Sequence, residues 1–110
     1  MKKFELDINL RILQVVAAVP KGKVATYGDI AQKAGMARAA RRVGQALRGL
    51  PKNTKIPWHR VVNAQGRISL TEGSAPHNIQ RHRLEKEGVL FNTNGALDLH
   101  RYRWCHENSS

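Results

Sequence analysis

The chain has 110 residues, a length typical of one domain, and 41% of them are hydrophobic, which excludes a disordered chain. Its formal net charge of +11 favours a polyanionic partner, nucleic acid before an anionic membrane surface. The single cysteine, Cys105, excludes an intrachain disulfide, and no apolar run approaches the ~20 residues of a membrane span. Acidic residues interrupt the basic N-terminus, so we expect no signal peptide and a cytoplasmic or nucleoid-associated protein.

The first predicted helix follows Asp7, a good N-cap, and ends at the turn Pro20–Gly22. Its apolar residues recur at spacings near 3.6 and predict one buried face, formed by Ile8, Ile12, Val15, Val16 and Val19. Residues 23–26 read as a short extended segment.

Thr26 is expected to begin a second helix, with Asp29 three residues later as its capping-box partner. The body of this helix is predicted over residues 27–34, with Ile30 and Ala31 facing inward. Gly35 supplies a C-terminal stop.

A third helix is predicted from about Arg38 to Arg48, stopped by Gly49, with Ala40, Val43 and Leu47 as its apolar side. Two short helices joined by a glycine-containing turn are typical of a helix-turn-helix. The spacing i, i+3, i+4, i+7 predicts one basic face made of Arg38, Arg41, Arg42 and Gln45. The second helix of a helix-turn-helix meets DNA with such a face, although an exposed basic face without a ligand would look the same.

After a loop over residues 50–55, the sequence predicts a small hairpin from residues 60–63 and 66–70. A further helix is expected from about Pro76 to Glu87, ended by Gly88. Later apolar residues are expected to fold back on the core: Val89, Leu90, Phe91, Leu97, Leu99, Tyr102 and Trp104. The predicted fold is mostly α with short β, a winged-helix-like helix-turn-helix in one domain over residues 1–110.

Three segments carry a resemblance to a known family: Thr26–Ala31, Ala39–Gly44, and Ile56–Val62, which reads Ile-Pro-Trp-His-Arg-Val-Val. The last resembles the active-site segment Pro-Cys-His-Arg-Val of the O6-alkylguanine-DNA alkyltransferases, with Trp58 in place of the cysteine. The resemblance is strongest over residues 7–88 and implies the fold of the alkyltransferase C-terminal domain. The tryptophan places the chain beside the alkyltransferase-like proteins, the non-enzymatic branch of that family.

That resemblance implies a protein that binds O6-alkylguanine in double-stranded DNA and transfers nothing. A thiolate attacks carbon, whereas the lone pair of an indole is tied up in its ring. The implied protein enters the minor groove, flips the damaged nucleotide, marks it for nucleotide excision repair proteins and blocks true alkyltransferases. It is expected to be a monomer without cofactor or metal.

The expected DNA-binding residues combine the basic face with the family's positions: Thr26, Tyr27, Arg38, Ala39, Arg41, Arg42, Gln45 and Arg48. By resemblance, Tyr27 helps rotate the phosphate of the target nucleotide, and Arg41 fills the gap that the flipped base leaves. A planar guanidinium can stack and hydrogen-bond there, which offsets part of the flipping cost of a few kcal/mol.

The implied lesion pocket consists of Pro57, Trp58, His59, Val61, Val62, Ser69, Leu70 and Thr71. Trp58 either stacks on an extruded base or plugs the pocket. By resemblance, His59, Arg60 and Glu87 survive from the catalytic relay as a structural network. The lid is expected to be the loop from Ser69 to Ser74. Its stretch from Leu70 to Ser74 differs from the family's pattern and has about two extra residues, which suggests a larger or differently shaped pocket. Leu50 stands where the enzymes usually carry an asparagine.

Two other functions stay open on the sequence. Cys105, next to His106, is a candidate substitute nucleophile for an active alkyltransferase, although its place near the end of the chain, far from the Pro-Trp-His-Arg segment, favours an incidental surface thiol. A plain helix-turn-helix regulator would read DNA sequence and ignore the lesion. The five histidines have no metal-binding spacing.

Overall fold

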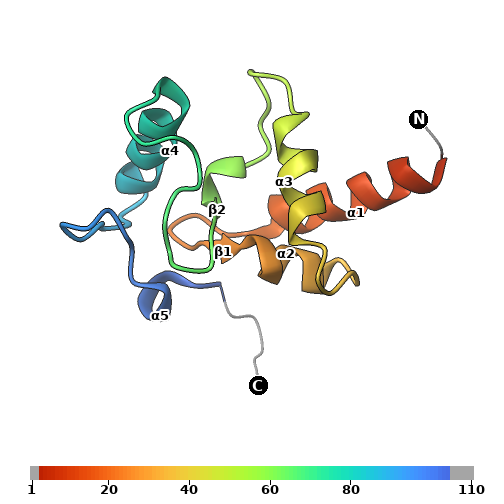
Figure 1. The fold of residues 1–110 in the computed structure, drawn as a ribbon, viewed down its shortest axis with the longest axis horizontal. Helices are drawn as coiled ribbons and strands as arrows, with labels where there is room; N and C mark the ends of the chain where they lie inside the picture. The colour runs from red at the N-terminus through yellow and green to blue at the C-terminus, as the bar shows by residue number, and fades with distance from the viewer. Residues whose placement is uncertain (1–2, 105–110) are drawn as a thin grey trace.

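The computed structural model describes residues 3–104 of the chain, and Figure 1 shows a mostly helical domain with one very short sheet. Its elements are α1 (Lys3–Ala18), β1 (Ala25–Thr26), α2 (Tyr27–Lys33), α3 (Ala40–Arg48), the 3-10 helix η1 (Trp58–Arg60), β2 (Val61–Val62), α4 (Ala75–Lys86) and α5 (Leu99–Tyr102). The fold class predicted from the sequence is therefore confirmed. None of these helices is long and apolar enough to cross a membrane.

Helix α1 begins at Lys3, so the prediction that Asp7 caps its N-terminus is wrong. No glycine or proline stands between residues 3 and 19 to stop a helix, and Asp7 lies on an exposed face inside it. The predicted apolar face is confirmed: Ile12, Val16 and Val19 are buried, and Ile8 and Val15 pack against the same core.

Helix α2 begins as the sequence predicts. The backbone N–H of Asp29 donates to Thr26 Oγ1 at 3.0 Å, and the N–H of Thr26 donates to Asp29 Oδ2 at 3.1 Å. At its other end Gly35 adopts φ +81°, and the next residue, Met36, donates its N–H to the carbonyl of Ala31. These bonds satisfy the free groups at both helix ends.

Helix α3 begins two residues later than predicted, because Arg38 has φ +71°, which a right-handed helix does not allow. Arg38 thus lies in the turn between α2 and α3 and does not share a helical face with Arg41. The buried side of α3 is Val43 and Ala46, whereas Ala40 and Leu47 are half-buried.

The predicted hairpin is wrong. Val61 and Val62 pair in parallel with Ala25 and Thr26, and the second predicted arm sends Arg67 to an antiparallel bridge with Ala96. The turn survives, with Gly66 N–H donating to Asn63 O at 3.0 Å, and one backbone bond crosses between the predicted arms, from Asn63 N–H to Arg67 O at 2.9 Å. Both residues of β2 are buried, which suits an interior strand better than a hairpin arm open to solvent on one face.

The short sheet separates two core clusters. Successive strand side chains point to opposite faces, so Val61 joins the cluster made by α1, α2 and α3, and Val62 joins the cluster under α4. The predicted return of the C-terminal segment is confirmed for Val89, Phe91, Leu97, Leu99, Tyr102 and Trp104. Leu90 is an exception, because its side chain is 64% exposed.

Candidate nucleic-acid interface

A cleft of about 890 Å³ opens between α3 and α4, with η1 at its base. Figure 1 shows these two helices on either side of the segment that carries η1 and β2. The wall from α3 consists of Ala40, Arg41, Gly44, Leu47 and Arg48, and the wall from α4 consists of Ala75, Pro76, Ile79, Gln80 and Arg83. Tyr27, Leu50, Pro51, Lys52, Trp58, Ser69 and Leu70 complete it.

The lining combines apolar surface with positive charge. Arg41, Arg48, Lys52 and Arg83 are its ionisable cations, and no aspartate or glutamate among the described residues lines it. An acid-free cationic cleft attracts phosphate, while its apolar walls suit a flat ring. A second cleft, of about 1000 Å³, lies between α1, α2 and Arg103, but it contains none of the predicted site residues.

The basic face of α3 is smaller than predicted. Arg41, Gln45 and Arg48 are exposed at spacings of four and three residues, and the two arginines line the cleft. Arg42 is half-buried and does not line it, and Ala39 packs against the core.

Two residues expected at this interface lie elsewhere. Thr26 is only 5% exposed, caps α2 and does not line the cleft. Arg38 is exposed in the preceding turn, outside the cleft lining.

Trp58 opens η1 and presents a half-buried indole to the cleft. The guanidinium carbon of Arg83 lies 5.4 Å from the centroid of this ring, within range of a cation–π contact. The ring of His59 meets the indole edge-on, with centroids 6.3 Å apart. Trp58 therefore forms part of the cleft wall, held between an imidazole and a guanidinium.

The other expected pocket residues divide into two groups. Ser69 and Leu70 line the cleft with Trp58. Val61 and Val62 are core residues, 1% and 0% exposed, so the expectation that they line the pocket is wrong. Half-buried Pro57 and exposed Thr71 also lie outside the lining, and buried His59 lies behind Trp58.

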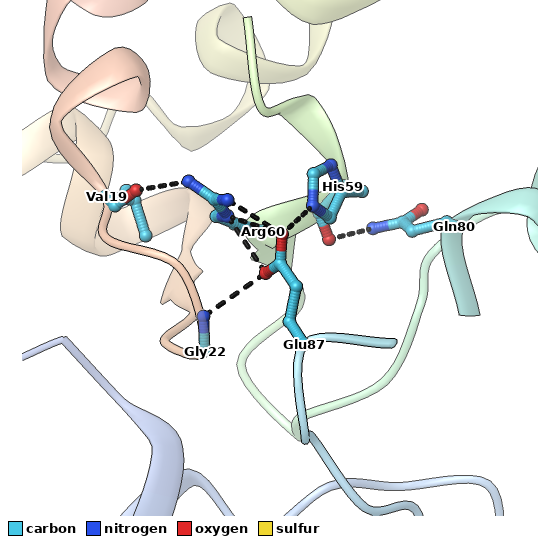
Figure 2. Close-up of polar contacts among 6 residues, drawn as sticks. All are labelled: Val19, Gly22, His59, Arg60, Gln80 and Glu87. Atoms are coloured by element: carbon cyan, nitrogen blue, oxygen red, sulfur yellow. Dashed lines mark hydrogen bonds and ion pairs between the residues drawn. The ribbon is translucent and has the colours of Figure 1, made fainter. Parts of the chain in front are cut away.

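Beneath the cleft, the carboxylate of Glu87 holds the three relay positions together, as Figure 2 shows. His59 Nε2 lies 2.9 Å from Glu87 Oε2. Arg60 donates from Nη2 to Oε2 at 2.7 Å and from Nε to Oε1 at 3.0 Å, and the N–H of Gly22 also donates to Oε1. Arg60 Nη1 then reaches the carbonyl of Val19, which ties the network to the end of α1.

The surroundings of this network shift the pKa values of both Glu87 and His59. Burial alone would raise the pKa of Glu87, but hydrogen bonds from Arg60, His59 and Gly22 lower that pKa to about 2. Burial lowers the pKa of His59, and the positive charges of Arg60 and Arg83 lower it further, against the raising effect of Glu87. At neutral pH His59 is therefore uncharged. With Nε2–H donated to the carboxylate, its buried Nδ1 is an acceptor that has no hydrogen-bond partner within the described part of the chain.

A neutral histidine oriented by a carboxylate is suited to accept a proton from a neighbouring nucleophile. The neighbour in this chain is the indole of Trp58, which has no acidic proton to give and no free lone pair. Cys105, the alternative nucleophile, lies outside the described residues. Among residues 3–104, no group of three or more histidine, cysteine, aspartate or glutamate side chains is arranged to hold a metal ion.

The sequence did not predict that helix α4 forms one wall of the cleft. Gln80 is buried and donates from Nε2 to the carbonyls of His59 at 3.1 Å and Val61 at 2.9 Å, which fixes the backbone behind Trp58. Arg83, which is not among the site residues expected from the sequence, completes the same wall. The available signal is the spacing of Pro76, Ile79, Gln80 and Arg83, which places them on one helical face.

Comparison with known proteins agrees with this geometry. The family model described as "6-O-methylguanine DNA methyltransferase, DNA binding domain" matches residues 7–89. The chain is 52% identical over 94 residues to the DNA base-flipping protein of Escherichia coli, covering 86% of this chain and 71% of that protein. It is 44% identical over 102 residues to alkyltransferase-like protein 1 of Schizosaccharomyces pombe, covering 89% and 94%.

A solved structure is also similar. The crystal structure of S. pombe Atl1 in complex with damaged DNA containing O6-carboxymethylguanine superposes with a TM-score of 0.79 at 41% sequence identity. The match covers 94% of this chain and 98% of that one.

Proposed function

Because the chain belongs to the 6-O-methylguanine DNA methyltransferase family, and is similar to its alkyltransferase-like members, we propose that it recognises O6-alkylguanine in DNA. It binds duplex DNA from the minor groove through α2 and α3, and it turns the damaged nucleotide into the cleft beside Trp58. It transfers no alkyl group. The name of the E. coli relative, DNA base-flipping protein, supports the flipping step.

One observation carries this proposal: Tyr27, Arg41 and Trp58 line the same acid-free cleft, although they come from three different elements. Each suits one step of nucleotide flipping. Arg41, exposed on α3, can enter the base stack and hold the gap open. Trp58 offers an aromatic surface for the extruded base, a contact worth roughly 1–3 kcal/mol. Cations around the cleft attract the phosphate backbone.

The absence of transfer follows from position 58. The His59–Glu87 pair retains a geometry that could deprotonate a thiol, but the residue before His59 is tryptophan. An indole cannot displace an alkyl group from oxygen, so the lesion stays intact in the complex. We propose that the bound protein then marks the lesion for nucleotide excision repair and shields it from alkyltransferases. It does so as an intracellular monomer.

The test is equilibrium binding to one duplex that carries guanine or O6-methylguanine at a single site. Binding is measured at two salt concentrations, and the intact mass of the protein is then measured by mass spectrometry. Tighter binding to the lesion with unchanged protein mass is the expected result. Equal affinity for both duplexes with a steep salt dependence would leave only a basic DNA binder. A mass gain of one methyl group would instead identify a transferase acting through Cys105.

The link to excision repair needs its own experiment. Purified excision proteins are given the lesion duplex with and without this protein, and incision is quantified on a sequencing gel. Incision that rises with this protein supports the marking role. Unchanged or reduced incision would contradict it, without affecting lesion binding itself.

A further inference from the structure

Arg83 is the one cation that the α4 wall contributes to the cleft. Its neighbouring arginine on the helix, Arg81, is paired with Glu85 at 3.1 Å and lies over the ring of Phe91. Among residues 3–104, Arg83 makes no comparable ion pair with a carboxylate. The helix therefore presents one neutralised arginine away from the cleft and one uncompensated arginine into it.

The acids near Arg83 are already engaged. Glu87 is held by Arg60, His59 and Gly22, and Glu85 is held by Arg81. The lining itself contains no carboxylate. A negative group that enters the cleft therefore meets no fixed negative charge on its walls, and it does not have to displace an existing partner of Arg83.

Contact with Trp58 holds the guanidinium in place for such a group. The guanidinium carbon lies 5.4 Å from the indole centroid. A guanidinium packed against an aromatic ring keeps its N–H donors in its own plane, where they can form two parallel hydrogen bonds with a carboxylate. Fixing the group beforehand reduces the conformational entropy that is lost when a ligand binds.

Apart from Gln80, whose buried amide donates to the carbonyls of His59 and Val61, the rest of this wall is apolar. Ile79 and Pro76 lie one and two turns before Arg83 on the same face of α4, and Leu70 of the lid segment lines the same cleft. A substituent on a base beside Trp58 thus meets apolar side chains along the wall and a single positive charge next to the indole.

From this arrangement we propose that Arg83 determines adduct specificity. It gives the protein a preference for O6 adducts that end in a carboxylate over neutral adducts of the same size. This inference rests on the proposed function, because it concerns a base already turned into the cleft.

The test compares two nearly isosteric lesions, O6-carboxymethylguanine and O6-carbamoylmethylguanine, which differ mainly in charge. Each is placed at the same position of one duplex, beside duplexes with O6-methylguanine and guanine. We expect the full chain to bind the carboxymethyl duplex about threefold to tenfold tighter than the carbamoylmethyl duplex at low salt. The ratio should shrink as salt rises, because the cleft is open to solvent.

Three variants decide whether Arg83 is responsible. Arg83→Gln should bring the carboxymethyl to carbamoylmethyl ratio close to one, and Arg83→Lys should keep part of it. Arg81→Gln, the matched control on the same helix, should keep the wild-type ratio.

The proposal is overturned if the wild-type ratio is near one, or if Arg83→Gln keeps it. It is also overturned if Arg83→Gln weakens all four duplexes equally, since that would identify a phosphate contact. These results differ from failure of the proposed function, in which the wild-type chain does not distinguish O6-methylguanine from guanine.

Discussion

The hydroxyl of Tyr27, at the start of α2, lies 2.7 Å from the hydroxyl of Ser69 in the segment before α4, although the two residues are 42 positions apart. Both line the cleft. This bond joins the helix-turn-helix to the opposite rim of the cleft, so the residue expected to act on the DNA phosphate is held by the residue that begins the lid.

We predict that Tyr27→Phe and Ser69→Ala each weaken binding to lesion DNA, by about twofold to tenfold for a lost hydrogen bond worth 0.5–1.5 kcal/mol. The double variant should lose little more than either single variant, because one bond is removed in all three. Fluorescence anisotropy on the O6-methylguanine duplex measures this. Fully additive losses would show that Tyr27 and Ser69 contact DNA independently and not through each other.

Arg41→Ala should reduce affinity for both lesion and plain duplexes, and more strongly for the lesion. Filling the vacated stack offsets part of a flipping cost of a few kcal/mol, so the lesion affinity should fall by about tenfold or more. Arg42→Ala removes the same charge from the half-buried flank of α3 and is the matched control. Equal losses in the two variants would mean that Arg41 contributes only charge.

Replacement of Trp58 distinguishes an indole that stacks on the extruded base from one that fills the cleft and keeps the base out. Trp58→Ala should lower the preference for O6-methylguanine over guanine by about fivefold to a hundredfold, the equivalent of the roughly 1–3 kcal/mol of a base–aromatic contact. Trp58→Phe should keep part of that preference. Titration of both duplexes with each variant gives the ratio directly. A rise in lesion affinity on Trp58→Ala would show instead that the indole plugs the cleft.

Gly44→Ala should stabilise the fold and weaken DNA binding. An added Cβ would lie 3.4 Å from Arg48 Nη1 and 4.0 Å from Tyr27 Cε1, which are ordinary contacts. The gain from a better helix former is about 0.5–1 kcal/mol, whereas the new methyl group enters the cleft. Urea unfolding and duplex titration measure the two effects. Gln14→Ala, exposed on α1 and outside the cleft lining, should leave DNA binding nearly unchanged.

The Glu87 network should make stability depend on acid pH. The pKa of Glu87 falls from an ordinary 4.5 to about 2 on folding, so the unfolded chain takes up the proton first as the pH drops. Its contribution, about 3 kcal/mol, is complete above pH 4.5 and disappears as the pH approaches 2. Glu87→Gln should therefore lower the free energy of unfolding at pH 7 and flatten its dependence between those values.

Glu85→Gln is the control for that experiment. Glu85 forms an exposed pair with Arg81 on α4, and such pairs contribute less than about 1 kcal/mol. Urea unfolding from pH 7 to pH 2.5 compares the two variants. Identical profiles for Glu85→Gln and Glu87→Gln would contradict the network described for Glu87.

The sequence by itself determined the features that depend on near neighbours. The capping box of Thr26 and Asp29 spans three residues, and the stop at Gly35 depends on that residue's own φ, so both were predicted correctly. The replacement at position 58 is likewise a property of the sequence. It carries the proposal that the chain transfers no alkyl group, because an indole lacks the nucleophilic lone pair of a thiolate in any fold.

Only the tertiary structure decided the pairing of β2 with β1, the backbone turn at Arg38 and the composition of the cleft. The Gly22–Glu87 bond spans 65 positions, and the approach of Arg83 to Trp58 joins two separate elements. Such contacts form because the apolar faces of distant segments pack together, and this packing brings the polar side chains of those segments within bonding distance. A local pattern shows which side chains will be buried, but it does not show which ones will then meet.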